Sequence, residues 1–147
     1  MAANNILNGT SIVVKTGVAG SETEIAFCTS ASSSLSMDTR DISNKSSAGW
    51  RELLEAQKSW SVSTEGLMAF RDADGTAVKS YDDLLIALVA RTAFSIELTP
   101  TALVSGDYRW SGKCFLTSLE QNDPMEDNVT WTATFEGTGV LTQTVTT

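Results

Sequence analysis

The acidic side chains are the main candidates for chemistry in this sequence, which contains 18 Asp and Glu residues and no histidine. Without histidine, the commonest general base near neutral pH is missing, together with Ser-His-Asp and Cys-His nucleophilic arrangements. Paired carboxylates could cleave a glycosidic bond if a cleft brought them together, but the acids here are scattered over turns and helix ends. We therefore expect a protein without enzymatic activity.

One acidic segment has the composition of a metal site. Asp72 and Asp74, with Asp83 further along the chain, could supply oxygen ligands to calcium. However, Gly75 stands at the fourth position of such a loop, whereas a calcium-binding helix-loop-helix needs glycine at the sixth. A turn that closes a hairpin is the simpler interpretation. We expect neither a metal nor any other cofactor.

The two cysteines, Cys28 and Cys114, also lack the pattern of a metal site, because they show no CxxC spacing and no histidine accompanies them. They could instead form a disulfide bond. Since residues 1–9 do not have the pattern of a secretory signal, reduced thiols in the protein interior are the simpler expectation.

Length and composition predict one folded domain that spans residues 1–147. The apolar fraction is 41% and the charged fraction 19%, which excludes a disordered chain. The longest apolar run, Leu84 to Ala90, is far shorter than the roughly 20 residues of a membrane span. The formal net charge of −8 disfavours tight binding to nucleic acid phosphates. We expect a soluble protein without membrane insertion.

Alternation of apolar and polar residues predicts a mostly β fold. The clearest case is 128–137, where Val129, Trp131, Ala133 and Phe135 alternate with polar residues and indicate a half-buried strand. Less regular alternation predicts further strands over 11–17, 24–28, 35–39, 59–65, 93–98 and 108–119.

One helix is predicted over about 80–91. Its apolar face consists of Tyr81, Leu84, Leu85, Leu88 and Val89. Ser80 is a suitable N-cap, Asp82 and Asp83 fall in the first turn, and Arg91 falls in the last, as the helix dipole favours. Strands followed by one helix and more strands predict a two-sheet β-sandwich or barrel with one flanking α-helix.

The four tryptophans divide into two groups. Trp60, Trp110 and Trp131 lie on the apolar faces of predicted strands, so we expect them in the core, although sugar-stacking platforms are an alternative. Trp50 is not part of any alternation of apolar and polar residues, so it is the better candidate for a contact surface.

Five sequence segments follow one another along the chain in an order that can be compared with known protein families. They are 9–15 (GTSIVVK), 38–45 with 49–54 (DTRDISNK, GWRELL), 58–63 (KSWSVS), 112–119 (GKCFLTSL) and 129–139 (VTWTATFEGTG). In this order and spacing the chain resembles the major tail tube protein family of long-tailed bacteriophages. The closing strand with its Gly-Thr-Gly is the most specific of these segments, whereas the helix region shares only its apolar pattern.

The resemblance implies a virion protein of the phage tail, assembled in the cytoplasm of the bacterial host. Homohexameric rings would stack around a tape measure protein into a tube that conducts the genome, so DNA would pass only transiently. The tube would join tail terminator and baseplate or distal tail proteins. Two other functions stay open: the tube of a secretion or tail-like injection device, and a stand-alone carbohydrate-binding β-sandwich.

A tube needs contacts between successive rings. We expect them from an extended loop over about 41–57, because this long stretch is poor in strand signals. Its candidate contact residues are Asp41, Lys45, Trp50 and Arg51, with Trp50 as the aromatic anchor. A short C-terminal tail is expected over about 139–147.

The bore of a tube should be polar without binding phosphate strongly. The polar faces of two predicted strands satisfy this condition. The candidate lumen-facing residues are Ser61, Ser63, Glu65, Thr132, Thr134 and Glu136. An ordinary exposed outer face of a sandwich is the alternative interpretation of the same residues.

Overall fold

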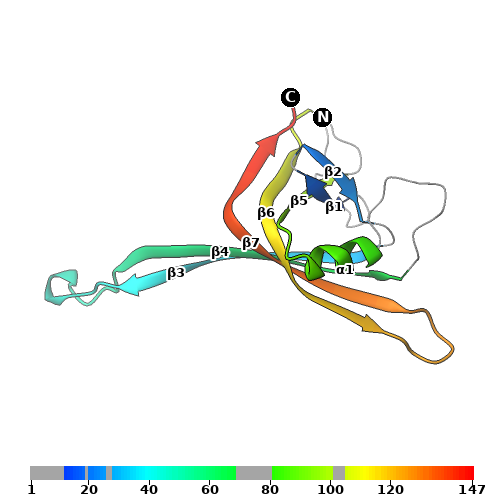
Figure 1. The fold of residues 1–147 in the computed structure, drawn as a ribbon. Coiled ribbons are helices and arrows are strands. Elements are labelled where there is room, and N and C mark those ends of the chain that lie inside the picture. Colours follow the sequence, from blue (N-terminus) through cyan, green and yellow to red (C-terminus); the bar gives the residue numbers. More distant parts are fainter. Residues whose placement is uncertain (1–11, 19, 26–27, 69–80, 101–104) are drawn as a thin grey trace, which may run out of the picture.

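Seven antiparallel strands and one α-helix make up the part of the chain that the computed structural model describes, residues 12–18, 20–25, 28–68, 81–100 and 105–147 (Figure 1). The strands are β1 (Ile12–Val18), β2 (Ser21–Glu24), β3 (Cys28–Asp41), β4 (Leu53–Leu67), β5 (Phe94–Pro100), β6 (Tyr108–Asn122) and β7 (Thr130–Val145). The helix α1 covers Tyr81–Val89, and a 3-10 turn, η2, covers Lys45–Ser47. The predicted fold class, mostly β with one flanking helix, is confirmed.

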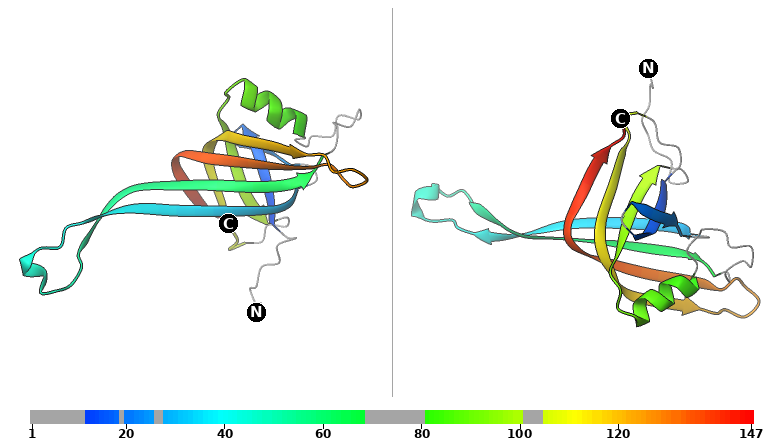
Figure 2. Two further views of the ribbon diagram at one scale, coloured as in Figure 1. Left: turned by 90° about the horizontal axis from the view of Figure 1, so that it is seen from below. Right: turned by 45° about the horizontal axis from the view of Figure 1, so that its top comes forward.

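The strands form one continuous sheet in the order β2-β1-β5-β6-β7-β4-β3. The strands β6 and β7 are long and bent, so that the sheet folds over itself into two layers (Figures 1 and 2). The short layer contains β1, β2 and β5 with residues 108–114 of β6 and 138–145 of β7. The long layer contains β3 and β4 with 115–122 of β6 and 130–137 of β7. The two predicted sheets are therefore two parts of one sheet.

The core lies between these layers. Its largest fully buried side chains include Trp131, Phe135 and Ile96, and the Phe94 and Phe135 rings meet edge to face with centroids 5.5 Å apart. Burial of alternate residues explains why 128–137 was recognisable as a strand, since Trp131, Ala133 and Phe135 all point inward.

Two of the three tryptophans predicted for the core, Trp60 and Trp131, are buried there. Trp110 is a correction, because 40% of its surface is exposed. It lies near the start of β6, where the two layers diverge around a slot also lined by Leu35 and Leu98. Trp110 does lie on the core face of β6, as predicted, but the opposite layer no longer covers that face at the position of Trp110.

The expected loop over 41–57 is also corrected. Its last part belongs to β4, because Asp41 pairs with Leu53 and Thr39 with Glu55. Residues 42–52 form the tip of a long β3–β4 hairpin that projects from the body (Figure 1). The strand predicted over 35–39 is part of β3, the first strand of this hairpin. The start of β3 is rich in serine, so apolar and polar residues do not alternate there and the sequence did not predict a strand.

The expected C-terminal tail is mostly strand, because β7 pairs with β6 as far as Tyr108 and Val145. The helix ends at Val89, so Arg91 follows the last turn instead of lying in it. The Ser80 cap and the acidic segment with Asp72 and Asp74 fall outside the described residues. In the described part, no helix has the length and apolar character that crossing a membrane requires.

Candidate assembly surfaces

The tip of the β3–β4 hairpin, residues 42–52, is folded by its own hydrogen bonds. The Asn44 side chain accepts from the Ser46 amide at 2.7 Å, and the Ser47 hydroxyl accepts from the Asn44 amide at 3.1 Å. The Trp50 amide donates to the Ser47 carbonyl at 2.9 Å. A tip ordered in this way loses little further conformational entropy when a partner binds it.

Three of the four residues predicted for contacts between rings, Lys45, Trp50 and Arg51, lie in this tip. The fourth, Asp41, is the last residue of β3, directly before it. Trp50 exposes 79% of its surface, and Lys45 is exposed in the 3-10 turn. Arg51 Nε lies 3.5 Å from Asp41 Oδ2. The pKa of Asp41 is lowered, chiefly by hydrogen bonds from the Ser43 side chain and backbone and less by Arg51. Because this ion pair is exposed, it contributes little to stability; it orients the two side chains.

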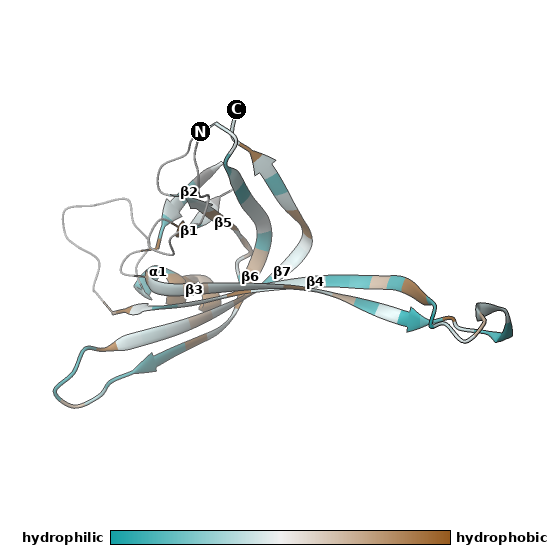
Figure 3. Ribbon diagram, turned by 180° about the vertical axis from the view of Figure 1, so that it is seen from behind, coloured by the Kyte–Doolittle hydropathy of each residue, from teal (hydrophilic) through white to brown (hydrophobic). Residues whose placement is uncertain are grey.

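Sequence reasoning missed further apolar side chains near the tip. Ile42, Leu53, Leu54 and Met37 are all exposed on the hairpin, and apolar colour interrupts the otherwise hydrophilic hairpin near its end (Figure 3). Ile42, Leu53 and Leu54 were visible in the sequence as apolar residues within the segment expected to be a loop, whereas Met37 lies in the strand predicted over 35–39. Clustered exposed apolar residues are typical of protein contact sites.

The six residues predicted to face a channel share one face of the long layer. The structure pairs Ser61 with Glu136, Ser63 with Thr134, and Glu65 with Thr132 across β4 and β7. The opposite face of these strands is the core side, with Val62, Thr64 and Phe135 buried. The sequence predicted the face of each strand, and the structure brings the two faces together.

The same polar face continues onto both neighbouring strands. On β3, the Ser34 hydroxyl lies 2.8 Å from that of Ser61, and the Ser36 hydroxyl 2.9 Å from that of Ser59. On β6, a bulge after Leu116 lets Glu120 pair with Thr132 on this face. Residues 30–36, 59–65, 115–122 and 130–136 contain no lysine or arginine. The face therefore combines hydroxyls with the carboxylates of Glu65, Glu120 and Glu136.

The long layer has a free edge on each side within the described part of the chain. On one side, β3 pairs with β4 alone. On the other, residues 115–122 of β6 pair with β7 alone, because β5 reaches only as far as Cys114. Unpaired strand edges present rows of backbone donors and acceptors that another chain can complete.

The helix α1 lies beside β6 and uses only part of its predicted apolar face on its own subunit. Leu84 is buried, and Tyr81 and Leu88 are half-buried against the core. Leu85 and Val89, predicted on the same face, are exposed instead. The face of α1 with Tyr81, Leu84 and Leu88 meets the core, whereas Leu85 and Val89 lie on the adjacent part of the helix surface, which is turned away from it.

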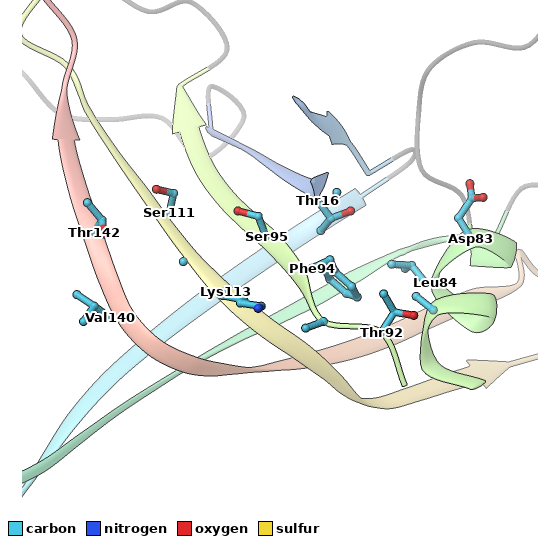
Figure 4. Close-up of a pocket in the computed structure, with 14 residues that line it drawn as sticks. Thr16, Asp83, Leu84, Thr92, Phe94, Ser95, Ser111, Lys113, Val140 and Thr142 are labelled. Atoms are coloured by element: carbon cyan, nitrogen blue, oxygen red, sulfur yellow. The ribbon is translucent and has the colours of Figure 1, made fainter. Parts of the chain in front are cut away.

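A cleft of about 670 Å³ separates α1 from β5, β6 and β7 (Figure 4). Leu84 lies on the helix side, and Phe94, Ser95 and Lys113 lie on the strand side. Asp83 and Lys113 are the ionisable side chains among its described lining residues. The described residues contain no group of three potential metal ligands.

Both cysteines are free, and neither has the environment of a reactive thiol. Burial raises the pKa of Cys114 to about 12. Burial also raises the pKa of Cys28, which is half-buried at the start of β3. The chemically capable residues are thus dispersed, and the organised features of the molecule are edges, faces and a projecting tip.

Comparison with known proteins gives this arrangement a context. The sequence model of a family described as phage tail tube proteins matches residues 6–143. A search of curated proteins finds no match. The fold resembles a chain in the virion of a native gene transfer agent particle, with a TM-score of 0.75 and 19% identity over 95% of this chain and 100% of that one.

Two further structures share the fold. One is a chain from the tail of an empty gene transfer agent particle refined with C6 symmetry, with a TM-score of 0.75 and 22% identity over 95% of this chain and 100% of that one. The other is the SPP1 tail tube protein, with a TM-score of 0.73 and 15% identity over 95% of this chain and 80% of that one.

Proposed function

The chain belongs to the phage tail tube protein family, and we propose that its copies close into rings through the free edges of the long layer. The role of the protein is structural, as a component of the virion tail, and not enzymatic. The observation that carries this proposal is that, among the described residues, the long layer is unpaired on both sides, at β3 on one side and at 115–122 of β6 on the other.

Strand directions permit this closure. Neighbouring strands alternate in direction from β6 through β7 and β4 to β3, because every pair is antiparallel. The β3 edge of one copy therefore runs antiparallel to the β6 edge of the next copy when the sheet is continued. A ring built this way leaves no free edge in the long layer, which removes the main route to random edge-to-edge aggregation.

Closure places one face of the long layer on the axis of the ring. The buried face packs on the short layer, so the polar face with Ser61, Ser63 and Thr134 is the one that lines the channel. Its carboxylates, those of Glu65, Glu120 and Glu136, repel DNA phosphates, and its hydroxyls offer only weak contacts. DNA then slides without the salt-sensitive binding that lysine or arginine would add.

Successive rings would be joined by the hairpin tip. Trp50 is a rigid, exposed aromatic on a pre-ordered tip, which is the usual character of a residue that dominates an interface. Asp41, Lys45 and Arg51 surround it with charges that orient the contact. The hairpin projects beyond the body (Figure 1), so it can reach a copy in the next ring.

The proposal extends to the number of copies and to the partners. Six copies per ring is the proposed number, and the C6 symmetry of the gene transfer agent tail, whose subunit has this fold, supports it. We place the tube around a tape measure protein, between a tail terminator and baseplate or distal tail proteins. Assembly takes place in the cytoplasm of the bacterial host, and DNA passes through the finished tube.

Hydrogen exchange on the purified protein before and after assembly tests ring closure. We expect negative-stain images of rods with a central channel at high protein concentration. In the rods, backbone amides of β3 and of 115–122 in β6 should gain protection. Residues 61–65 of β4 and 132–136 of β7, which are paired on both sides in one copy, serve as the internal control. A protein that stays monomeric, as a carbohydrate-binding module would, overturns the proposal.

A further inference from the structure

The two lateral sides of the folded sheet are built differently. Beside β6, α1 covers the opening between the two layers (Figure 2). Beside β3, at the opposite side in the same views, no helix covers the opening in the described part of the chain. The subunit therefore has one closed side and one open side.

The open side exposes part of the core. A slot of about 190 Å³ there is lined mainly by apolar side chains, among them Leu35 of β3, Leu98 of β5 and Trp110 of β6. A second cleft of about 480 Å³ adjoins it along β3, between Ile12 and Ala31. Leu35, Trp110 and Ile12 are exposed in the single subunit. Within the described residues, the open side is thus an exposed apolar surface.

The closed side carries an apolar surface of its own. On the part of α1 that faces away from the core, Ile86 exposes 67% of its surface and Val89 exposes 76%, and Leu85 beside them is exposed as well. A helix that is apolar on both faces is typically buried on both. Its inner face packs on the subunit through Leu84, whereas no described residue of the same copy covers the outer face.

Ring closure through β3 and β6 puts these two surfaces together. When the β6 edge of one copy meets the β3 edge of the next, the helix beside β6 comes to the open side beside the next copy's β3. We propose that α1 is shared by two copies, and that Ile86 and Val89 close the open side of the neighbour over Leu35 and Trp110. This inference rests on the proposed ring and adds a second layer of contacts outside the channel wall.

The shared helix explains two features that the isolated subunit does not. It accounts for Trp110, a large aromatic on the core face of β6 that is nevertheless left partly exposed. It also accounts for a short helix, Tyr81–Val89, whose apolar residues exceed what its own subunit can bury. Each copy would complete the core of the next, so the apolar surfaces become fully covered only in a closed ring.

The first test is the pair of substitutions Ile86→Asp and Val89→Asp, with Val140→Asp as the matched control. Val140 exposes 82% of its surface but lies on β7, on the strand side of the cleft between α1 and the sheet. We expect the helix variant to melt as a monomer like the wild type, because both residues are exposed there. The concentration at which rings form should rise about a hundredfold or more, and the control should assemble like the wild type.

The second test is cross-linking in assembled material, which does not depend on weakened assembly. In a Cys28→Ser background, Ile86→Cys combined with Leu35→Cys should give a ladder of covalent oligomers that ends at the ring size with a short bis-maleimide. Replacing Ile86→Cys by Val140→Cys should leave dimers at most. Rods of the double-cysteine protein without this ladder, or normal rods of the variant with Ile86→Asp and Val89→Asp, overturn the shared helix alone. A wild-type protein that never assembles overturns the proposed function together with it.

Discussion

Gly137 lies against the indole of Trp60 so closely that a Cβ atom on this glycine would overlap the ring at Cε2, Cδ2 and Nε1. The same indole covers Gly112 on β6, where a Cβ would lie 2.5 Å from Cζ2, and its Nε1 donates to the Gly139 carbonyl at 3.3 Å. One tryptophan thus contacts β6 and β7 at the point where the two layers meet.

Gly137→Ala should therefore destabilise the subunit by about 1–3 kcal/mol, the usual cost of overfilling a packed site. Urea unfolding of the monomer measures the change. The control is the same substitution in a Trp60→Leu background, where the added methyl group has room. We expect Gly137→Ala to cost clearly less there, and equal costs in both backgrounds would show that the indole is not the reason.

This corner of the fold could not be predicted from the sequence. The segment with Gly137 and Gly139 was recognised as the end of a strand, because glycine interrupts alternation and commonly marks a bend. At this point, however, the strand packs against Trp60, which is 77 residues earlier than Gly137 in the sequence. Contacts of that range leave no local pattern, so the strand was predicted to stop where β7 in fact bends and continues.

Local patterns succeeded where one face is buried and the other exposed. Trp131, Ala133 and Phe135 are buried at alternate positions, and the strand was found with its correct faces. They failed for β3, where serines occupy both faces and no alternation exists. For the same reason the faces of Ser61 and Thr134 were predictable, but their place on one shared surface was not, because register is a long-range property.

The assembly surfaces were predictable to different degrees. Trp50 was predicted as a contact residue because it lies outside the alternating segments, where the pattern assigns no side chain to the core. The free edges of β3 and β6 required the strand order, which no single segment contains. The helix pattern predicted an apolar face over Leu84 and Leu85, but which residues meet the core depends on how far the neighbouring strands extend.

Trp50→Ala should leave a folded, soluble subunit and abolish or strongly reduce long tubes, because it removes the main apolar anchor of the tip and nothing from the core. Circular dichroism and thermal melting check the fold, and negative-stain microscopy checks assembly. Rings are expected to persist, since ring closure uses other surfaces. Val140→Ala, an equally exposed apolar truncation on β7, is the control. Normal tube lengths for the Trp50 variant would remove the tip from the contact.

Glu65→Lys combined with Glu136→Lys should make assembled tubes retain DNA. The two changes replace two negative charges by two positive ones on the face proposed for the channel, a shift of four units per copy, and phosphate contacts with lysine raise affinity at low salt. Binding of a short fluorescent duplex to purified tubes measures the effect, which should disappear at high salt. The control pair, Glu24→Lys with Glu97→Lys, adds the same charge on the short layer. Equal retention by both variants would contradict a channel-facing position.

Cys114 should resist thiol reagents in the native protein. With a pKa raised to about 12 by burial, only about one thiol in ten thousand is ionised at pH 8, and the thiolate is the reactive form. A Cys28→Ser variant isolates this thiol for labelling with a chromogenic disulfide reagent. We expect labelling to begin only with unfolding and to follow the urea transition. Fast labelling in native buffer would show that this part of the core opens.

Arg91 ends α1 in a conformation that suits glycine better. The Thr92 amide donates to the Ala87 carbonyl at 3.1 Å and the Arg91 amide to the Leu88 carbonyl at 3.2 Å, the hydrogen bonds of a helix end with a left-handed residue. Arg91 takes that position with φ at 55°. A side chain there is strained, whereas glycine is not.

Arg91→Gly should consequently be more stable than Arg91→Ala by about 1 kcal/mol. The comparison between these two variants is the informative one, because both remove the charge that the helix C-terminus favours. The wild type should fall between them or near the glycine variant, since its charge offsets part of the backbone strain. Urea unfolding of the three monomers gives the order. If the alanine variant is as stable as the glycine variant, the strain at this helix end is absent in solution.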